Sequence, residues 1–200
     1  MRKTMWVALA TAMAVLGGCE TATPVKVTRF HLNAPLDRGG VIVAANPALS
    51  NIAALEADLY AAAIRDAMAA QGFAPSSDAA APLYASFTVG RTIREVEPAR
   101  SPVTIGIGGG SFGGGVGGGV GGGASVAFGV GKKRAREAYV TELSVQIRRG
   151  AAGEIVWEGR ALTEADTRSP DAQPPATARK LAQALFKGFP GESGRTISVK

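Results

Sequence analysis

The chain has 200 residues and a formal net charge of +6 at pH 7, with 46% hydrophobic and 19% charged residues. This length is typical of a single domain. The sequence contains one cysteine and one histidine, which excludes an internal disulfide and a metal site built from several cysteine and histidine ligands. The modest positive charge is typical of a solvated basic surface, with anionic lipid headgroups as the alternative partner.

The N-terminus predicts an exported protein. Arg2 and Lys3 precede the uncharged run of residues 5–16, which is shorter than the roughly 20 apolar residues of a spanning helix. A basic start, a short apolar core and small residues before a cleavage site are typical of a secretory signal. Residues 16–19 (LGGC) resemble the lipobox of bacterial lipoproteins. This sequence departs from the usual pattern at Gly17, where Ala, Ser or Thr is usual. The alternative is an ordinary signal peptide with an accidental cysteine.

The lipobox resemblance implies cleavage between Gly18 and Cys19, removal of residues 1–18, and lipid on Cys19. It also implies two or three acyl chains, and hence stable attachment, because one chain alone holds a protein only marginally. Glu20 stands where Asp would favour inner-membrane retention in enterobacteria. By analogy we expect a periplasm-facing protein on the outer membrane, with residues 19–24 as its tether. In that compartment nucleic acid is not an expected partner.

The first half of the mature chain predicts two strands and a helix. Residues 25–32 (VKVTRFHL) are rich in β-branched and aromatic residues and predict a strand with a bulge or an edge position. A second, short strand covers residues 41–43. The predicted helix spans residues 51–71, with Ser50 as its N-cap and Gly72 at its end. We expect this helix to pack across a sheet, with a partner-binding groove as the alternative. Spacings of three and four place these apolar residues on its buried face: Ile52, Leu55, Leu59, Ala63 and Ala67.

The second half predicts three more strands and a second helix. Residues 83–89 alternate apolar with polar, as do residues 139–147, and residues 155–161 follow a glycine-containing turn as the second strand of a hairpin. After a loop over residues 163–175, Pro175 can open the second helix, with Ala178, Leu181 and Leu185 on its buried face. Residues 191–200 fray or add a short strand. We therefore predict one α+β domain over residues 25–200, a mainly antiparallel sheet of about five strands with both helices on one face.

Residues 103–131 form a glycine-rich insertion between two predicted strands. Residues 106–131 contain 15 of the 27 glycines, and glycine has the largest backbone entropy to lose on folding, so a mobile loop is expected. The alternatives are a membrane helix with small residues spaced by four and a loop that orders on a partner or bilayer. A basic cluster follows, which could contact anionic headgroups or a partner, or be the solvated start of a strand: Lys132, Lys133, Arg134 and Arg136.

Two sequence patterns resemble catalytic motifs without their required context. Residues 109–113 match G-x-S-x-G around Ser111, but that motif needs a strand before it, a helix after it and a later histidine, whereas His31 comes earlier. Residues 108–113 match G-x-G-x-x-G without the surrounding βαβ unit. The carboxylates of Glu142, Glu154, Glu158 and Asp171 show no acid–base spacing. We predict no catalytic residue, metal or cofactor, and we interpret Trp157 as a core anchor.

The order of these features resembles a family of bacterial lipoproteins, domain of unknown function 4136. The resemblance covers residues 25–189 and includes the alanine-rich helix ending in QGF (residues 71–73), the glycine-rich insertion and the IVWEG strand (residues 155–159). The family implies no agreed activity and no catalytic residues. We therefore expect a non-catalytic envelope lipoprotein that binds or helps assemble another envelope component. The alternatives are a lipid- or glycan-binding module using Trp157 and the basic cluster, and a hydrolase using Ser111.

Overall fold

The structure, a computed structural model, describes residues 23–33, 35–36, 38–96 and 136–200. Several predictions fall outside these ranges and stay predictions: the signal peptide, the cleavage site at Gly18 and Cys19, the glycine-rich insertion, and three residues of the basic cluster, Lys132, Lys133 and Arg134.

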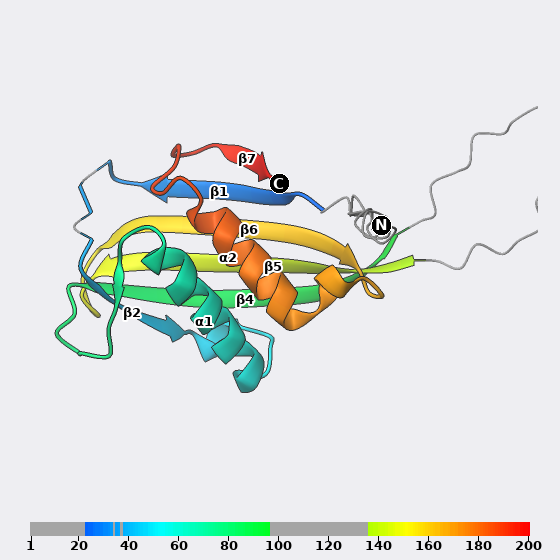
Figure 1. The fold of residues 1–200 in the computed structure, drawn as a ribbon, viewed down its shortest axis with the longest axis horizontal. Helices are drawn as coiled ribbons and strands as arrows, with labels where there is room; N and C mark the ends of the chain where they lie inside the picture. Colours follow the sequence, from blue (N-terminus) through cyan, green and yellow to red (C-terminus); the bar gives the residue numbers. More distant parts are fainter. Residues whose placement is uncertain (1–22, 34, 37, 97–135) are drawn as a thin grey trace, which may run out of the picture.

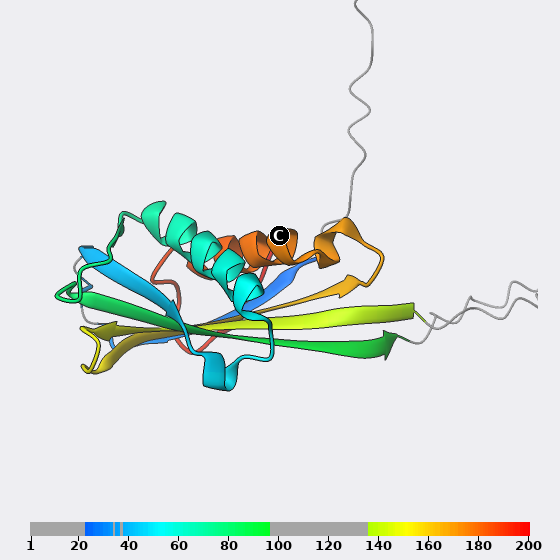
Figure 2. The ribbon, with the colours of Figure 1, turned by 90° about the horizontal axis from the view of Figure 1, so that it is seen from below.

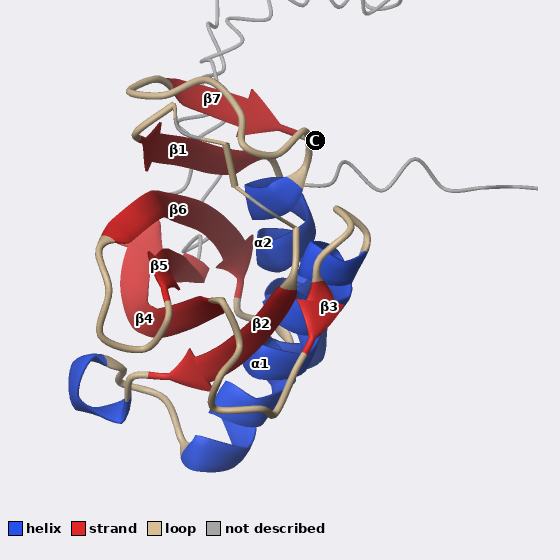
Figure 3. Ribbon diagram, turned by 90° about the vertical axis from the view of Figure 1, so that its left-hand side faces the viewer, coloured by secondary structure: helices blue, strands red, loops and turns tan. Residues whose placement is uncertain are grey.

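The described chain folds into one seven-stranded sheet with two helices on one of its faces (Figures 1 and 3). The strand order across the sheet is β3-β2-β4-β5-β6-β1-β7. In chain order the elements are β1 (Val25–His31), β2 (Gly40–Ala45), η1 (Pro47–Leu49), α1 (Ala54–Ala69), β3 (Ala74–Pro75), β4 (Leu83–Val96), β5 (Arg136–Arg149), β6 (Ile155–Asp166), η2 (Pro170–Ala172), α2 (Pro174–Phe186) and β7 (Thr196–Val199).

The predicted mixture of a mostly antiparallel sheet and two helices is confirmed, but the described residues form seven strands instead of about five. The two additional strands lie at the edges: β3 has two residues and β7 has four. Segments this short are too brief to show an alternating pattern. The pairs β4–β5, β5–β6, β6–β1 and β1–β7 are antiparallel. β2 runs parallel to β4 because α1 supplies the crossover that parallel neighbours need.

Helix α2 buries the face that its sequence predicts, with Ala178, Leu181 and Leu185 all at most 1% exposed. These side chains pack on the centre of the sheet, whose strands contribute alternate residues to the same core. In β5, for example, Leu143, Val145 and Ile147 are all 0% exposed, as their alternation predicts.

The prediction of the buried face of α1 is wrong for its two leucines, which are exposed. Leu55 is 83% exposed and Leu59 is 41% exposed. The helix instead packs through a stripe spaced by four residues, Tyr60, Ile64 and Met68, each 0% exposed. Alanine is present on every side of this helix, so spacing alone does not select a face. The widest side chains decide it, because they fill the space above the sheet.

Helix α1 also starts later than predicted, at Ala54, and its N-cap is Ala53 without a side-chain cap bond. Ser50 is engaged elsewhere: its Oγ donates to the carbonyl of Asn46 and accepts from the amide of Val89. The serine therefore fixes the turn that leads from η1 back toward β4. This hydrogen bond joins residues 39 positions apart, so the predicted cap at Ser50 is wrong for a reason that local sequence does not contain.

Candidate functional site

Among the predicted contact residues, only Arg136 is described. It is the first residue of β5, is exposed, and pairs with Val96 of β4. Ser111 also lies outside the described ranges. None of the helices in the described part of the chain is long and apolar enough to cross a membrane.

His31 ends β1 and uses both ring nitrogens in local contacts. Its Nε2 lies 3.0 Å from the carbonyl of Gly191, and its Nδ1 lies 3.3 Å from the amide of Asn33. Since an amide can only donate and a carbonyl can only accept, the ring carries its proton on Nε2. In this arrangement the histidine ties the loop after β1 to the segment before β7. Within the described ranges, no group of three or more His, Cys, Asp or Glu could hold a metal ion.

The four carboxylates considered as an acid–base pair in the sequence analysis each contact a different residue. Glu158 pairs with Arg160 at 3.4 Å, and Asp171 pairs with Lys180 at 2.6 Å. Glu154 lies 3.9 Å from Arg149, and Glu142 accepts a hydrogen bond from Ser144. Each acidic side chain thus has its own separate neighbour, and the structure does not bring two of them together.

Trp157 is a core residue, as its sequence context predicts. Its side chain is 0% exposed, its Nε1 donates to the carbonyl of Pro190 at 3.1 Å, and its ring stacks on Phe186 with centroids 5.4 Å apart. Phe189 tilts against it at 5.2 Å. A fully buried ring offers no surface for a sugar to stack on, so Trp157 does not support glycan binding.

Both helices lie on the same side of the sheet, so in the described part of the chain the opposite face carries neither α1 nor α2 (Figure 2). The outward side chains on that face are largely polar or charged. One row crosses five strands in register: Thr88, Ser144, Arg160, Thr28 and Thr196. The two threonine hydroxyls at its end lie 2.7 Å apart. We call the outward side chains of β4, β5, β6, β1 and β7 the open face. Its second row contains Ser86, Gln146, Glu158 and Phe30.

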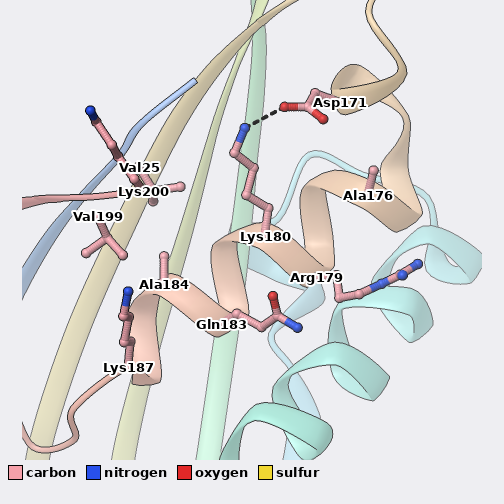
Figure 4. Close-up of a pocket in the computed structure, with 10 residues that line it drawn as sticks. All are labelled: Val25, Asp171, Ala176, Arg179, Lys180, Gln183, Ala184, Lys187, Val199 and Lys200. Atoms are coloured by element: carbon pink, nitrogen blue, oxygen red, sulfur yellow. Dashed lines mark hydrogen bonds and ion pairs between the residues drawn. The ribbon is translucent and has the colours of Figure 1, made fainter. Parts of the chain in front are cut away.

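A groove of about 450 Å³ lies along the outer side of α2, between this helix and the strands β1 and β7 (Figure 4). Four basic residues line it: Arg179, Lys180, Lys187 and Lys200. The groove also contains Asp171, which pairs with Lys180. Its apolar part comes from Val25, Ala184 and Val199. We call this site the basic groove.

Sequence reasoning missed the basic groove because its parts are distant in the chain. Lys180 and Lys187 are seven residues apart, which places them on the same side of α2, and this spacing is the one local signal. The segments around Val25 and Val199 reach the groove only because β1 and β7 pair with each other at the edge of the sheet.

A second polar cluster lies under the start of α1. Arg91 of β4 pairs with Glu56 at 3.1 Å, donates to the carbonyl of Ala172, and places its guanidinium carbon 4.1 Å from the centre of the Tyr139 ring. Both charged side chains are less than one-fifth exposed. Nearby, Tyr60 is 0% exposed, and its hydroxyl has no hydrogen-bond partner among the described residues. Burial, and secondarily the charge of Glu56, raise the pKa of Tyr60 to about 12, against an opposing effect of Arg91.

Tyr60 should therefore make the protein less stable at high pH. The pKa of Tyr60 is about 12 in the folded chain against about 10 when unfolded. Its stabilising contribution is complete below pH ~10 and is lost as the pH rises toward ~12, by an amount on the order of 2–3 kcal/mol. We expect Tyr60→Phe to unfold at the same urea concentration as the wild type at pH 8, and to lose less stability above pH 10. Parallel pH profiles for the two proteins would contradict this.

The comparisons with known proteins place most of the chain in one family. A family model described as "Domain of unknown function (DUF4136)" matches residues 42–191. Uncharacterized protein ZMO1243 of Zymomonas mobilis subsp. mobilis is 43% identical over 60 residues, which are 30% of this chain and 23% of that protein. The chain thus spans less than a quarter of that curated relative.

Two solved structures share a broad likeness with the chain. The PelC dodecamer from Paraburkholderia phytofirmans has 12% identity and a TM-score of 0.45, and the match covers 81% of this chain and 94% of that one. A PDZ domain protein from Parabacteroides distasonis has 9% identity and a TM-score of 0.44, covering 90% of this chain and 40% of that one. With TM-scores below 0.5, neither bears on what this chain binds.

Proposed function

We propose a function from the premise that the chain belongs to the family described as Domain of unknown function (DUF4136). Neither this description nor the uncharacterised relative indicates an enzymatic family. We propose that the protein is a non-catalytic binding module of the bacterial cell envelope. In this proposal lipid on Cys19 holds it on a membrane, outer rather than inner, and the open face of its sheet binds another envelope component.

The observation that carries the proposal is the open face. Both helices cover the same side of the sheet, so the other side presents mainly polar and charged side chains, most of them half-buried. Strands lie about 4.8 Å apart and rise about 3.3 Å per residue, so β4, β5, β6 and β1 offer a face on the order of 700 Å². This is close to the ~800 Å² that each partner contributes to a standard protein interface.

The open face is also chemically suited to recognition rather than to reaction. Two of its rows contain mainly threonine, serine and glutamine, with a charge pair in Arg160 and Glu158. The neighbouring rows add further charged side chains, among them Glu142 and Arg148. Such groups offer hydrogen-bond donors and acceptors in fixed register, which favours specificity. A serine hydrolase using Ser111 would need a histidine base, and His31 is occupied at Gly191 and Asn33. Ser111→Ala would have to abolish a measured activity for that alternative to replace the present proposal.

The test is site-specific photo-crosslinking in the cell with the full-length chain. A photoreactive phenylalanine analogue replaces Thr88 or Arg160 on the open face, and Asp58 or Ala62 on the exposed side of α1 as matched controls. We expect a specific protein adduct from the open-face positions and none from α1. Adducts from α1 alone would move the contact to the helices, and the absence of adducts at all four positions would contradict a protein-binding module.

The anchor is tested in the same strains. Wild-type protein should incorporate labelled palmitate and fractionate with membranes, and Cys19→Ala should lose the label. Label retained by Cys19→Ala would overturn lipid attachment at this residue without affecting the crosslinking result.

A further inference from the structure

We propose that the basic groove binds the phosphate headgroup of an anionic phospholipid in the membrane that carries the protein. The inference deepens the proposed function, because its membrane setting rests on the lipid anchor at Cys19. The binding site itself consists of described residues, most of them on α2, β1 and β7.

The first argument is the charge of the groove. Arg179, Lys180, Lys187 and Lys200 contribute four basic side chains to the groove, against one acidic side chain among the lining residues, that of Asp171. Figure 4 shows Lys180 extended toward Asp171 along one side of the groove and Lys187 at the other end. The ion pair at 2.6 Å neutralises Asp171 and leaves an excess of positive charge around the groove. A phosphate diester carries one negative charge, and ammonium groups bind it as point charges.

The second argument concerns the end of α2, which would otherwise repel an anion. The last carbonyls of a helix carry a partial negative charge. Two of these carbonyls belong to the groove residues Ala184 and Lys187. Both accept hydrogen bonds from the buried guanidinium of Arg29, at 3.0 and 2.9 Å. The positive charge of Arg29 therefore compensates the partial negative charge at the end of α2. As a result, this end of the helix does not weaken the positive potential of the groove.

The third argument is the mixed chemistry of the lining. The partly exposed Val199 places apolar surface beside the ammonium groups, next to the buried Val25 and Ala184. Figure 4 shows the two valines beside one another, across from the helix. A free phosphate has no apolar atoms that could pack on this surface, whereas the glycerol carbons and the first methylenes of a phospholipid would cover it. The volume of about 450 Å³ lies within the ~300–1,000 Å³ of sites that hold small molecules.

The fourth argument is position. Val25 lines the groove and follows Cys19 by six residues. Six residues span at most about 20 Å even when fully extended. Lipid on Cys19 would therefore keep the groove within about 20 Å of the membrane surface, and the short tether would present it to headgroups without a large loss of entropy.

The test measures binding of a soluble lipid to the purified full-length protein, and thus does not depend on the anchor. The probe is monomeric dihexanoylphosphatidylglycerol, titrated by calorimetry at low ionic strength. Dihexanoylphosphatidylcholine, which has the same phosphate diester but no net charge, and inorganic phosphate serve as comparison ligands. We expect binding of the phosphatidylglycerol, about ten-fold weaker binding of the phosphatidylcholine, and weakening by added salt.

Three variants locate the site. Lys187→Glu with Lys200→Glu should weaken phosphatidylglycerol binding about ten-fold or more. Arg149→Glu with Arg195→Glu makes the same change in net charge on exposed residues outside the groove, and should leave binding within about two-fold of wild type. Asp171→Asn frees Lys180 and should tighten binding a few-fold, a gain that a misfolded variant would not produce.

Each outcome decides the proposal. Equal affinity for inorganic phosphate and phosphatidylglycerol would overturn the proposal that the ligand is a lipid, and would identify the groove as a site for free anions. Equal effects of the two double variants, or no phosphatidylglycerol binding, would overturn the groove as a site. Palmitate label that is absent from the wild-type protein, or retained by Cys19→Ala, would refute the anchor at Cys19, whereas the groove proposal would stand if phosphatidylglycerol still binds.

Discussion

Replacing Arg29 with methionine should lower the free energy of unfolding by about 3–5 kcal/mol. Arg29 lies in the middle of β1 and is only 3% exposed. Its Nε donates to the carbonyl of Leu185 at 2.9 Å, and one terminal nitrogen donates to those of Ala184 and Lys187. Methionine keeps much of the aliphatic stem but leaves these three carbonyls at the end of α2 without their donor. A buried acceptor that loses its donor costs about 1–3 kcal/mol.

Burial disfavours the charged guanidinium and so lowers the pKa of Arg29. The charge is nevertheless retained, since arginine remains protonated in proteins, and the partial negative charge of the helix end compensates it. Arg29→Lys should be intermediate, because one ammonium cannot reproduce the planar fork.

Urea unfolding followed by circular dichroism measures the Arg29 effect. Arg168→Met is the control: Arg168 is 73% exposed and pairs with Asp166, so this change should stay within about 0.5 kcal/mol. A loss below about 1 kcal/mol for Arg29→Met would mean that water satisfies the carbonyls at the end of α2.

The elements that could be predicted are those whose own residues determine them. Alternation over residues 83–89 and 139–147 predicts β4 and β5, and the buried side of β5 follows from its parity. The spacing of Ala178, Leu181 and Leu185 predicts the packing of α2. In each case one side of the element is clearly more apolar than the other, so a single orientation buries the larger surface.

The features that could not be predicted depend on contacts distant in sequence. Arg29 sits in a strand whose alternation it breaks, and its partners lie more than 150 residues further on. The packing face of α1 depends on the shape of the space beneath Tyr60 and Ile64, since Leu55 and Leu59 fit the helical spacing equally well. The basic residues of α2 can be identified from the sequence alone. The groove cannot, because it forms only where β1 and β7 pair beside the helix.

The resemblance to the family identified from the sequence is confirmed by the match over residues 42–191. One of its motifs, IVWEG at residues 155–159, now has a physical account. Trp157 and Gly159 are two residues apart in β6, so their positions face the same side of the sheet. The indole ring lies over Gly159, and Gly159 is directly opposite Arg29 in the neighbouring strand. A residue without a side chain is required here, because the ring of Trp157 and the side chain of Leu185 occupy the space that a Cβ would fill.

Gly159→Ala should accordingly cost about 3 kcal/mol, and Gly159→Val more, because both overpack a filled core. A Cβ at this position would overlap the ring of Trp157 and lie 2.8 Å from Cδ1 of Leu185. Neither neighbour can retreat easily: the ring is held between Phe186, Phe189 and the carbonyl of Pro190, and Leu185 is 0% exposed. Thermal and urea unfolding of the variant measure the loss.

Gly90→Ala is the matched control for Gly159→Ala, because Gly90 lies in β4 of the same sheet and a Cβ there would meet nothing within 4 Å. It should leave stability unchanged or raise it by up to about 1 kcal/mol, since alanine has less backbone entropy to lose. Trp157→Phe removes the part of the indole that overlaps the new methyl group. Combined with Gly159→Ala it should therefore cost at least about 1 kcal/mol less than the sum of the two single changes. Additive costs would mean that the alanine is resisted by the backbone or by Leu185, and not by the tryptophan.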